Sequence, residues 1–415
     1  MAKRIALNKD STVTHKPNSS LSRLAGKLDR DRIDPPVITL WMFLGQTLSS
    51  DHSCRDAVHR LNAWRVSRQK KKADFHTTAY CEARQRLPEK VVKELAKRSG
   101  KTCQQHAAGR WHWKGRNIKV VDEFTLTMPD TLENPKEYPQ QRGQKKGCGF
   151  PILRCVMLFC LSTGAALDIA MGPFRGKQTG ENIYQAIIGC YDVVMRSHHR
   201  RKIDFRRGVK QGPCDQIVEY LKPDHRPIGM SKRDYQKCPK SISVRHVRYA
   251  VKRKGFRVRR IILATTLLDA KIYGVEDLAQ LYCRRWQLDI RSLKTHMQMD
   301  HLRCKSPSMV RKEIYAHMIA YNSIRDLIVH VSVAYETSPK ELSHKGTVQA
   351  LNAFSDRLQI NSDCLDALEA ALYESIAEHP IGDRKPRVHP REIKRRRKNY
   401  KLMQKPRHAH RKHAS

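Results

Sequence analysis

The chain has 415 residues, which is long enough for two or three domains that each bury a core. Its 81 Lys and Arg face only 40 Asp and Glu, a formal charge of +41. A surplus this large needs a polyanionic partner, and nucleic acid fits best. No window approaches about 18 uninterrupted apolar residues, and the basic start lacks the apolar core of a signal peptide. We therefore expect a cytoplasmic protein without a membrane partner.

The twelve cysteines are scattered, with no CxxC pair and no zinc-type Cys/His spacing. They are expected to be reduced and mostly buried. His408, His410 and His413 gather near the end of the chain, but in a basic tail a solvated polar stretch explains them, and we assign them no role.

Residues 38–99 show helical periodicity, with Ser50, Asp51 and Ser53 as possible helix caps. We expect a helical N-terminal domain over residues 1–116. The lysine run Lys70 to Lys72 and the nearby arginines are compatible with DNA contact or with a merely solvated face, and the sequence leaves both open.

A second domain is predicted over residues 117–335. The run of Ile118, Val120 and Val121 directly precedes Asp122, as in a buried strand that delivers a carboxylate at its end. Two more strand-like runs, 152–161 and 165–171, are separated by turn residues, so three neighbouring antiparallel strands are expected.

Later segments complete the predicted outline. Strands are expected at 192–195 and 260–267, with a largely β insertion at about 198–255 between them. A basic helix should span 275–297, and apolar helices should follow at 309–330 and 364–377. A helical C-terminal region is expected over 336–383. The tail over 384–415 is dense in Lys and Arg and is expected to be disordered until it meets a polyanion.

Eight stretches in order resemble the insertion-sequence transposases of the IS-four type, which are relatives of the Tn-five transposase. The matching stretches are Cys54–Arg65, Tyr80–Pro88, Lys119–Thr131, Asn134–Val156, Gly172–Glu181, Asp192–Gly208, Leu281–Pro307 and Met309–Asn322. The resemblance implies an α/β fold, a ribonuclease-H-like mixed sheet with flanking helices and a β-rich insertion. It also implies a bacterial protein that binds the inverted repeats of a transposable element as a homodimer and joins them to target DNA.

Catalysis in this family uses three carboxylates that hold two Mg²⁺ or Mn²⁺ ions around a scissile phosphate. By resemblance, Asp122 is the first carboxylate, although it is followed by Glu123 and Phe124 instead of Gly and Ser or Thr. An Asp that caps the next turn is the plainer interpretation of Asp122. The segment that should carry the second carboxylate is missing between Gly172–Glu181 and Asp192, and Asp192 is a poor substitute.

The third carboxylate belongs to a helical signature of Tyr, Arg, Glu and Lys. Tyr282 and Arg285 fit it, but the Glu is missing, and counting places Asp289 there as a metal ligand or as an ion-pair partner of Arg285. A two-residue deletion rotates the rest of a helix by roughly 200°, so the segment before or after it should face wrongly. Tyr282, Arg285, Arg291 and Lys294 would contact phosphates of the transposon end.

Three functions remain open. The chain is either an active transposase, a catalytically inactive DNA-binding remnant of one, or an RNA-binding basic protein. The ordered motifs disfavour the last, and the missing carboxylates favour reduced or no catalysis.

Overall fold

The fold is known from a computed structural model of the chain. It describes residues 36–49, 51–143, 145–174, 192–197, 201–226, 230–253, 256–285, 292–360, 364–381 and 403–406. No helix within these ranges is long and apolar enough to cross a membrane. The eleven cysteines among them are all free, and five of these are buried, so the prediction that most of them are buried is wrong for the described residues.

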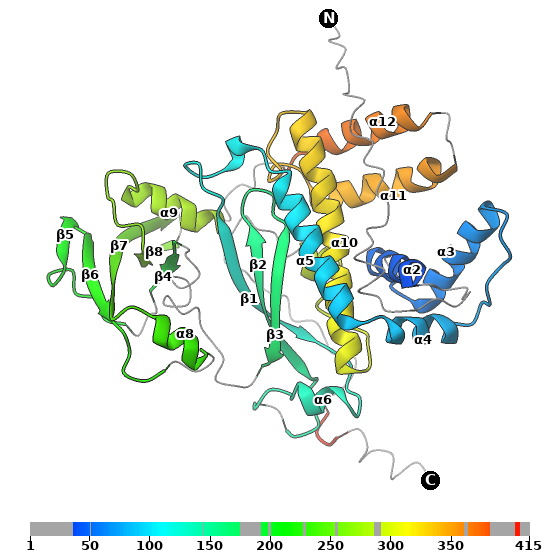
Figure 1. The fold of residues 1–415 in the computed structure, drawn as a ribbon, viewed down its shortest axis with the longest axis horizontal. Helices are drawn as coiled ribbons and strands as arrows, with labels where there is room; N and C mark the ends of the chain where they lie inside the picture. Colours follow the sequence, from blue (N-terminus) through cyan, green and yellow to red (C-terminus); the bar gives the residue numbers. More distant parts are fainter. Residues whose placement is uncertain are drawn as a thin grey trace, which may run out of the picture.

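A three-stranded antiparallel sheet lies in the middle of the molecule (Figure 1). Its strands, in spatial order, are β1 (Lys119–Thr127), β2 (Ile152–Cys160) and β3 (Ala166–Pro173). The turn between β2 and β3 is closed by Gly164, whose φ of 76° is the left-handed conformation that favours glycine. The three neighbouring antiparallel strands predicted from the sequence are thus confirmed.

Two long helices, α5 (Glu89–Gln105) and α10 (Pro307–Ala334), pack on each other and against β3 (Figure 1). The middle of α10 is buried over most of its circumference because it runs through the centre of the molecule. Asn322 of α10 fixes the arrangement: its side chain accepts from the backbone N–H of Ala166 and donates to the Ala166 carbonyl, both at 2.8 Å. The same amide also donates to Ser99 of α5 at 3.0 Å.

A second sheet is formed by five antiparallel strands in the order β4-β8-β7-β6-β5. Their bounds are Val194–Arg196 for β4, Val209–Gly212 for β5, Asp215–Leu221 for β6, Ser241–Arg253 for β7 and Phe256–Thr265 for β8. Helices α8 (Lys232–Lys237) and α9 (Val275–Arg284) lie beside this sheet (Figure 1).

The described strands do not form the predicted mixed sheet. The strands expected at 192–195 and 260–267 pair with β7 or with each other in the second sheet, and every strand pair in both sheets is antiparallel. A parallel pair needs a strand reached by a crossover of a dozen or more residues. The resemblance would place that strand where the sequence lacks residues, ahead of Asp192.

Shorter helices surround the two sheets. Three of them lie on the side of α5 and α10 away from the second sheet (Figure 1): α2 (Pro36–Leu48), α3 (Cys54–Ser67) and α4 (Thr78–Arg86). The cap predicted at Ser53 is present, because its hydroxyl accepts from the Asp56 N–H at 3.0 Å. Four further elements are the single turns η1 (Gly109–Trp111) and α6 (Asn134–Glu137) and the helices α11 (His344–Ile360) and α12 (Leu365–Ala377).

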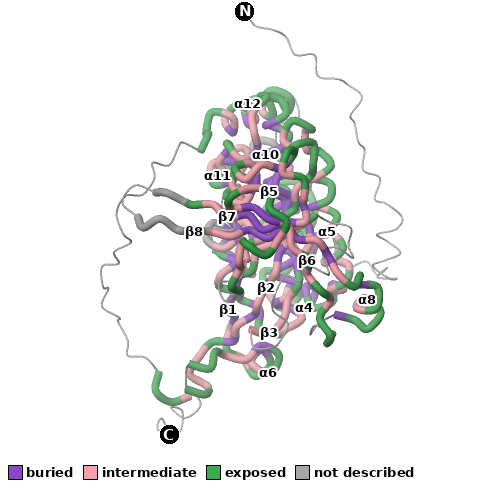
Figure 2. The backbone as a smooth tube through the Cα atoms, turned by 90° about the vertical axis from the view of Figure 1, so that its left-hand side faces the viewer, coloured by how far each residue is buried: buried purple, intermediate pink, exposed green. Residues whose placement is uncertain are grey.

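The helices predicted at 309–330 and 364–377 correspond to α10 and α12, and α11 lies inside the region 336–383 that was expected to be helical, although no helix with its own bounds was predicted. Buried residues concentrate around the two sheets and α10, while α8 and α12 are largely exposed (Figure 2). The basic tail lies outside the described residues except for 403–406.

Candidate functional site

Asp122 lies on the face of β1 that turns towards the protein interior. Side chains alternate along a strand, so Asp122 shares its face with Val120, Phe124 and Leu126, all of which are buried. Val120 belongs to the hydrophobic core shared with the second sheet and α9, whereas Phe124 and Leu126 belong to the core under α5 and α10. Asp122 thus stands where the two cores meet.

The predicted position of Asp122 at the end of its strand is wrong. Strand β1 continues to Thr127, and Asp122 lies inside this edge strand, paired with Met157 of β2. The strand is longer than expected because the apolar alternation resumes with Phe124 and Leu126 after the acidic pair. Glu123 points to the opposite face, where its carboxylate forms an ion pair of 3.3 Å with Arg154 of β2. Its charge therefore does not crowd Asp122.

Arg285 is the cation beside Asp122. Its Nη1 lies 3.5 Å from Asp122 Oδ1, and its guanidinium lies over the ring of Tyr282, 5.2 Å from the centroid. The two charged side chains keep 28% and 35% of their exposure, so both are accessible to a ligand. Tyr282 itself packs against the core formed by α9 and the second sheet. Three residues predicted for the site, Asp122, Tyr282 and Arg285, therefore come together.

Lys294 reaches the same face of β1 from a different element. Its ammonium lies 5.8 Å from the centre of the Phe124 ring, two residues along the strand from Asp122. It stands on η3 (Ser292–His296), a π-helical turn. The predicted misorientation across the deletion is therefore not observed, since Arg285 and Lys294 both face β1. A π-helical turn advances fewer degrees per residue than an α-helix, which changes the direction of the side chains.

Asp289 and Arg291 lie outside the described residues. Asp192 is described, just ahead of β4, and its carboxylate is held by Arg116 at 2.7 Å and by the Thr266 hydroxyl at 3.1 Å. Both carboxylate oxygens of Asp192 are thus engaged at the edge of the second sheet. The ion pair with Arg116 gives the Asp192 carboxylate a structural role that needs no metal ion.

The described residues around Asp122 do not by themselves form a site for a pair of divalent metal ions. Such a site needs several carboxylates around two cations. Within the described ranges, the one group of three potential metal ligands that lie close together does not include Asp122. The guanidinium of Arg285 instead lies 3.5 Å from Oδ1 of Asp122.

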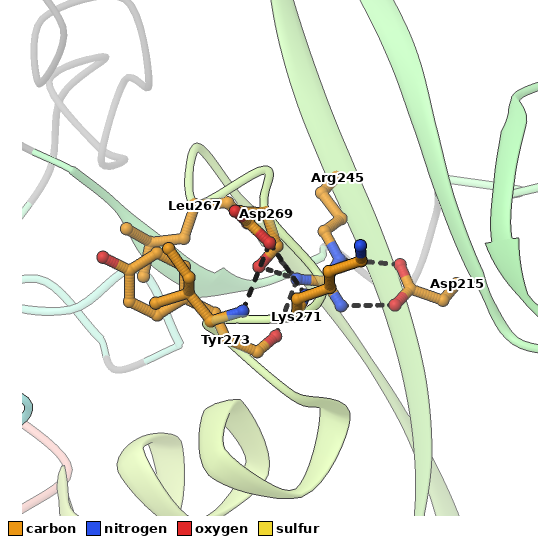
Figure 3. A network of polar contacts seen from close by, with 7 residues as sticks. Asp215, Arg245, Leu267, Asp269, Lys271 and Tyr273 are labelled. Carbon is orange, nitrogen blue, oxygen red and sulfur yellow. Dashed lines mark hydrogen bonds and ion pairs between the residues drawn. The ribbon is translucent and has the colours of Figure 1, made fainter.

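The turn ahead of α9 is anchored by a buried arginine that the sequence did not point to. Arg245 of β7 is fully buried, and its guanidinium forms a two-pronged ion pair with Asp215 of β6 (Figure 3). Its Nη1 donates to the Tyr273 carbonyl at 2.7 Å and lies near the carbonyls of Leu267 and Asp269. No spacing in the sequence relates residues 215 and 245. Arg245 thus fixes the start of the helix that carries Tyr282 and Arg285.

Comparison with known proteins gives a consistent result. The family model described as "Transposase DDE domain" matches residues 113–323, just over half of the chain. The chain is 23% identical over 322 residues to the transposase InsG of insertion sequence element IS4 from Escherichia coli K12, covering 71% of this chain and 70% of InsG. A shorter match, 33% over 69 residues, links it to the putative transposase InsL of element IS186A from the same organism, covering 16% of this chain and 19% of that one.

Among solved structures, a piggyBac transposase synaptic complex with hairpin DNA aligns with 84% of this chain and 77% of its own. The identity is 12% and the TM-score 0.39, which is too low to establish a shared fold. The family match and the InsG similarity confirm the resemblance stated from the motifs: the chain belongs to the DDE-domain transposases, among the members related to the IS-four type.

Proposed function

We propose that this protein binds the terminal inverted repeats of an insertion sequence and that its metal-dependent DNA cleavage is reduced or lost. The observation that supports this is the pairing of Asp122 with Arg285, while no group of three potential metal ligands in the described part of the chain includes Asp122. Its ancestors in the family would have cut and joined DNA on a ribonuclease-H-like core with two Mg²⁺ or Mn²⁺ ions.

DNA binding rests on a different set of groups from catalysis. Arg285 and Lys294 are half-buried cations on one face of β1, with the ring of Tyr282 beneath the guanidinium. Guanidinium and ammonium groups with restricted side chains are suited to phosphate contacts that fix register on a duplex. The formal charge of +41 adds attraction that does not depend on sequence. We expect a homodimer on paired transposon ends, in the cytoplasm beside the nucleoid.

Retained catalysis is the alternative function. It needs Asp289, and a further carboxylate, to approach Asp122 when DNA and metal are bound. Arg285 would then have to leave Asp122 for a phosphate. A DNA phosphate could draw the guanidinium away and leave Asp122 free to bind a metal ion. Cleavage should then appear only with Mg²⁺ or Mn²⁺ and should vanish in Asp122→Asn.

Arg285→Gln and Lys294→Gln are expected to weaken binding to a duplex that carries the element's terminal repeat. Each lost phosphate contact lowers the slope of log K against log salt by about 0.9. Fluorescence anisotropy from about 50 to 200 mM salt measures this slope. Asp122→Asn should bind at least as tightly as the unmodified protein, because it removes a negative charge and releases Arg285.

Lys345→Gln is the matched control. Lys345 is exposed at the start of α11, and its loss removes the same charge. Its slope should equal that of the unmodified protein. Equal slopes for Arg285→Gln, Lys294→Gln and Lys345→Gln would show that Arg285 and Lys294 do not contact DNA and would contradict the proposed function.

A further inference from the structure

Two histidines and an aspartate gather where the end of α5 meets α10. His106 is the residue that caps the C-terminus of α5, and Asp326 and His330 are one turn apart on α10. One potential ligand atom from each residue lies within 4.8 Å of the other two. The two imidazole rings are 4.7 Å apart, centre to centre. The group shares no residue with the site around Asp122.

The three side chains are held by elements that packing makes rigid. Positions four apart on a helix project from the same face, so Asp326 and His330 point together. The neighbouring residue Arg325 faces the interior, where its Nε donates to the Thr163 carbonyl at 3.0 Å. Val329, which lies between Asp326 and His330 in the chain, is fully buried in the core that also holds Cys103 of α5. The cluster is therefore positioned by the contact between α5 and α10.

Hydrogen bonds orient both rings. His330 Nδ1 lies 2.8 Å from the backbone carbonyl of Asp326, and since a carbonyl only accepts, Nδ1 carries the proton and Nε2 keeps a lone pair. His106 Nδ1 lies 2.8 Å from Asp326 Oδ1, so an ion held by both residues would replace the proton of this hydrogen bond. The carbonyl that binds the Nδ1–H of His330 orients this ring and makes it more basic as a metal ligand.

Two imidazole nitrogens and one carboxylate oxygen are a donor set for late first-row divalent ions. Zn²⁺, Co²⁺ and Ni²⁺ accept nitrogen ligands, whereas Mg²⁺ prefers oxygen. The three side chains keep between 29% and 46% of their exposure, so a bound ion would retain positions for water. The strongly basic chain gives a dication no general attraction, so affinity has to come from direct coordination.

We propose that His106, Asp326 and His330 form a binding site for a late first-row divalent ion such as Zn²⁺, which joins the end of α5 to α10. The site is separate from the cleavage chemistry of the family. It is stabilising: an ion that binds only the folded chain raises its melting temperature. Without an ion, the same residues form a hydrogen-bonded tie between the two helices.

The test titrates metal-free full-length protein with CoCl₂ and reads the visible absorption of inner-sphere Co²⁺, then repeats the titration with ZnCl₂ and follows thermal unfolding. The unmodified protein should bind one more equivalent than His106→Gln/His330→Gln. With Zn²⁺ at a hundredfold excess over Kd, its melting temperature should rise by a few °C. His76→Gln, which removes an exposed histidine of the α3–α4 segment, should behave like the unmodified protein.

Sites in the histidine-containing tail are common to all these variants and cancel in the comparison. The double variant is expected to have a lower melting temperature without metal, because it loses the tie through Asp326, so the readout is the rise caused by the ion. Equal stoichiometry and an equal rise in the unmodified and double-variant proteins would overturn the proposal, and so would the absence of any rise in the unmodified protein.

Discussion

Replacing Arg245 with methionine should lower the free energy of unfolding by about 3–5 kcal/mol, the cost of removing one partner of a buried ion pair. Asp215 would remain in the interior, where it is 4% exposed, without its counter-charge. The Tyr273 carbonyl would lose its donor as well. Urea titration followed by circular dichroism measures the change. Binding to the terminal repeat should also fall, because the turn ahead of α9 loses its anchor.

The contribution of burial can be separated from that of the ion pair itself. Arg206→Met removes an arginine of the same sheet region whose ion pair with Asp204 is exposed at the surface, and it should leave the unfolding midpoint unchanged. Adding Asp215→Leu to Arg245→Met should recover part of the lost stability, since the unpaired charge is then gone. If Arg245→Met alone were as stable as the unmodified protein, the network in Figure 3 would not hold the second sheet to α9.

Gly100→Ala is the second substitution with a large expected effect. Gly100 lies where α5 rests on the start of β3, and a Cβ at this position would lie 2.2 Å from the Ala166 carbonyl oxygen. That oxygen accepts from Asn322, so α5 would have to move away from both β3 and α10. Overpacking of this kind costs about 1–3 kcal/mol, and here the obstacle is backbone, which yields little. The unfolding midpoint in urea should therefore fall.

Gly45→Ala is the matched control with the opposite sign. Gly45 lies inside α2, where a Cβ would meet nothing within 4 Å. Alanine is a better helix former than glycine by about 0.8–1.0 kcal/mol, so this variant should be more stable than the unmodified protein. If Gly100→Ala were stabilised to the same degree as Gly45→Ala, the close approach of α5 to β3 would be refuted.

Local patterns in the sequence predicted much of this fold. The strand-like apolar runs on either side of a Ser-Thr-Gly turn predicted β2 and β3, and the apolar helical pattern over 309–330 predicted most of α10. The motif string predicted that Asp122, Tyr282 and Arg285 share a site. These features could be predicted because each depends on residues that are neighbours in the sequence or on an ordered set of motifs.

Features that depend on distant residues were not predictable in this way. The pairing of β4 and β8 within the second sheet depends on β7, and β7 in turn is tied to β6 by Arg245 and Asp215. The extension of β1 beyond Asp122 depends on the core that accepts Phe124 and Leu126. The approach of His106 to Asp326 and His330 depends on the packing of α5 against α10, which brings together residues more than two hundred positions apart.

Binding of transposon ends without cutting can be tested on a single gel. The full-length protein is incubated with a labelled duplex that carries the element's terminal repeat, with and without Mg²⁺ or Mn²⁺. We predict a salt-sensitive band shift and no cleavage under either condition. Metal-dependent cutting at the repeat boundary that disappears in Asp122→Asn would contradict the claim and establish that Asp122 still serves a working metal site.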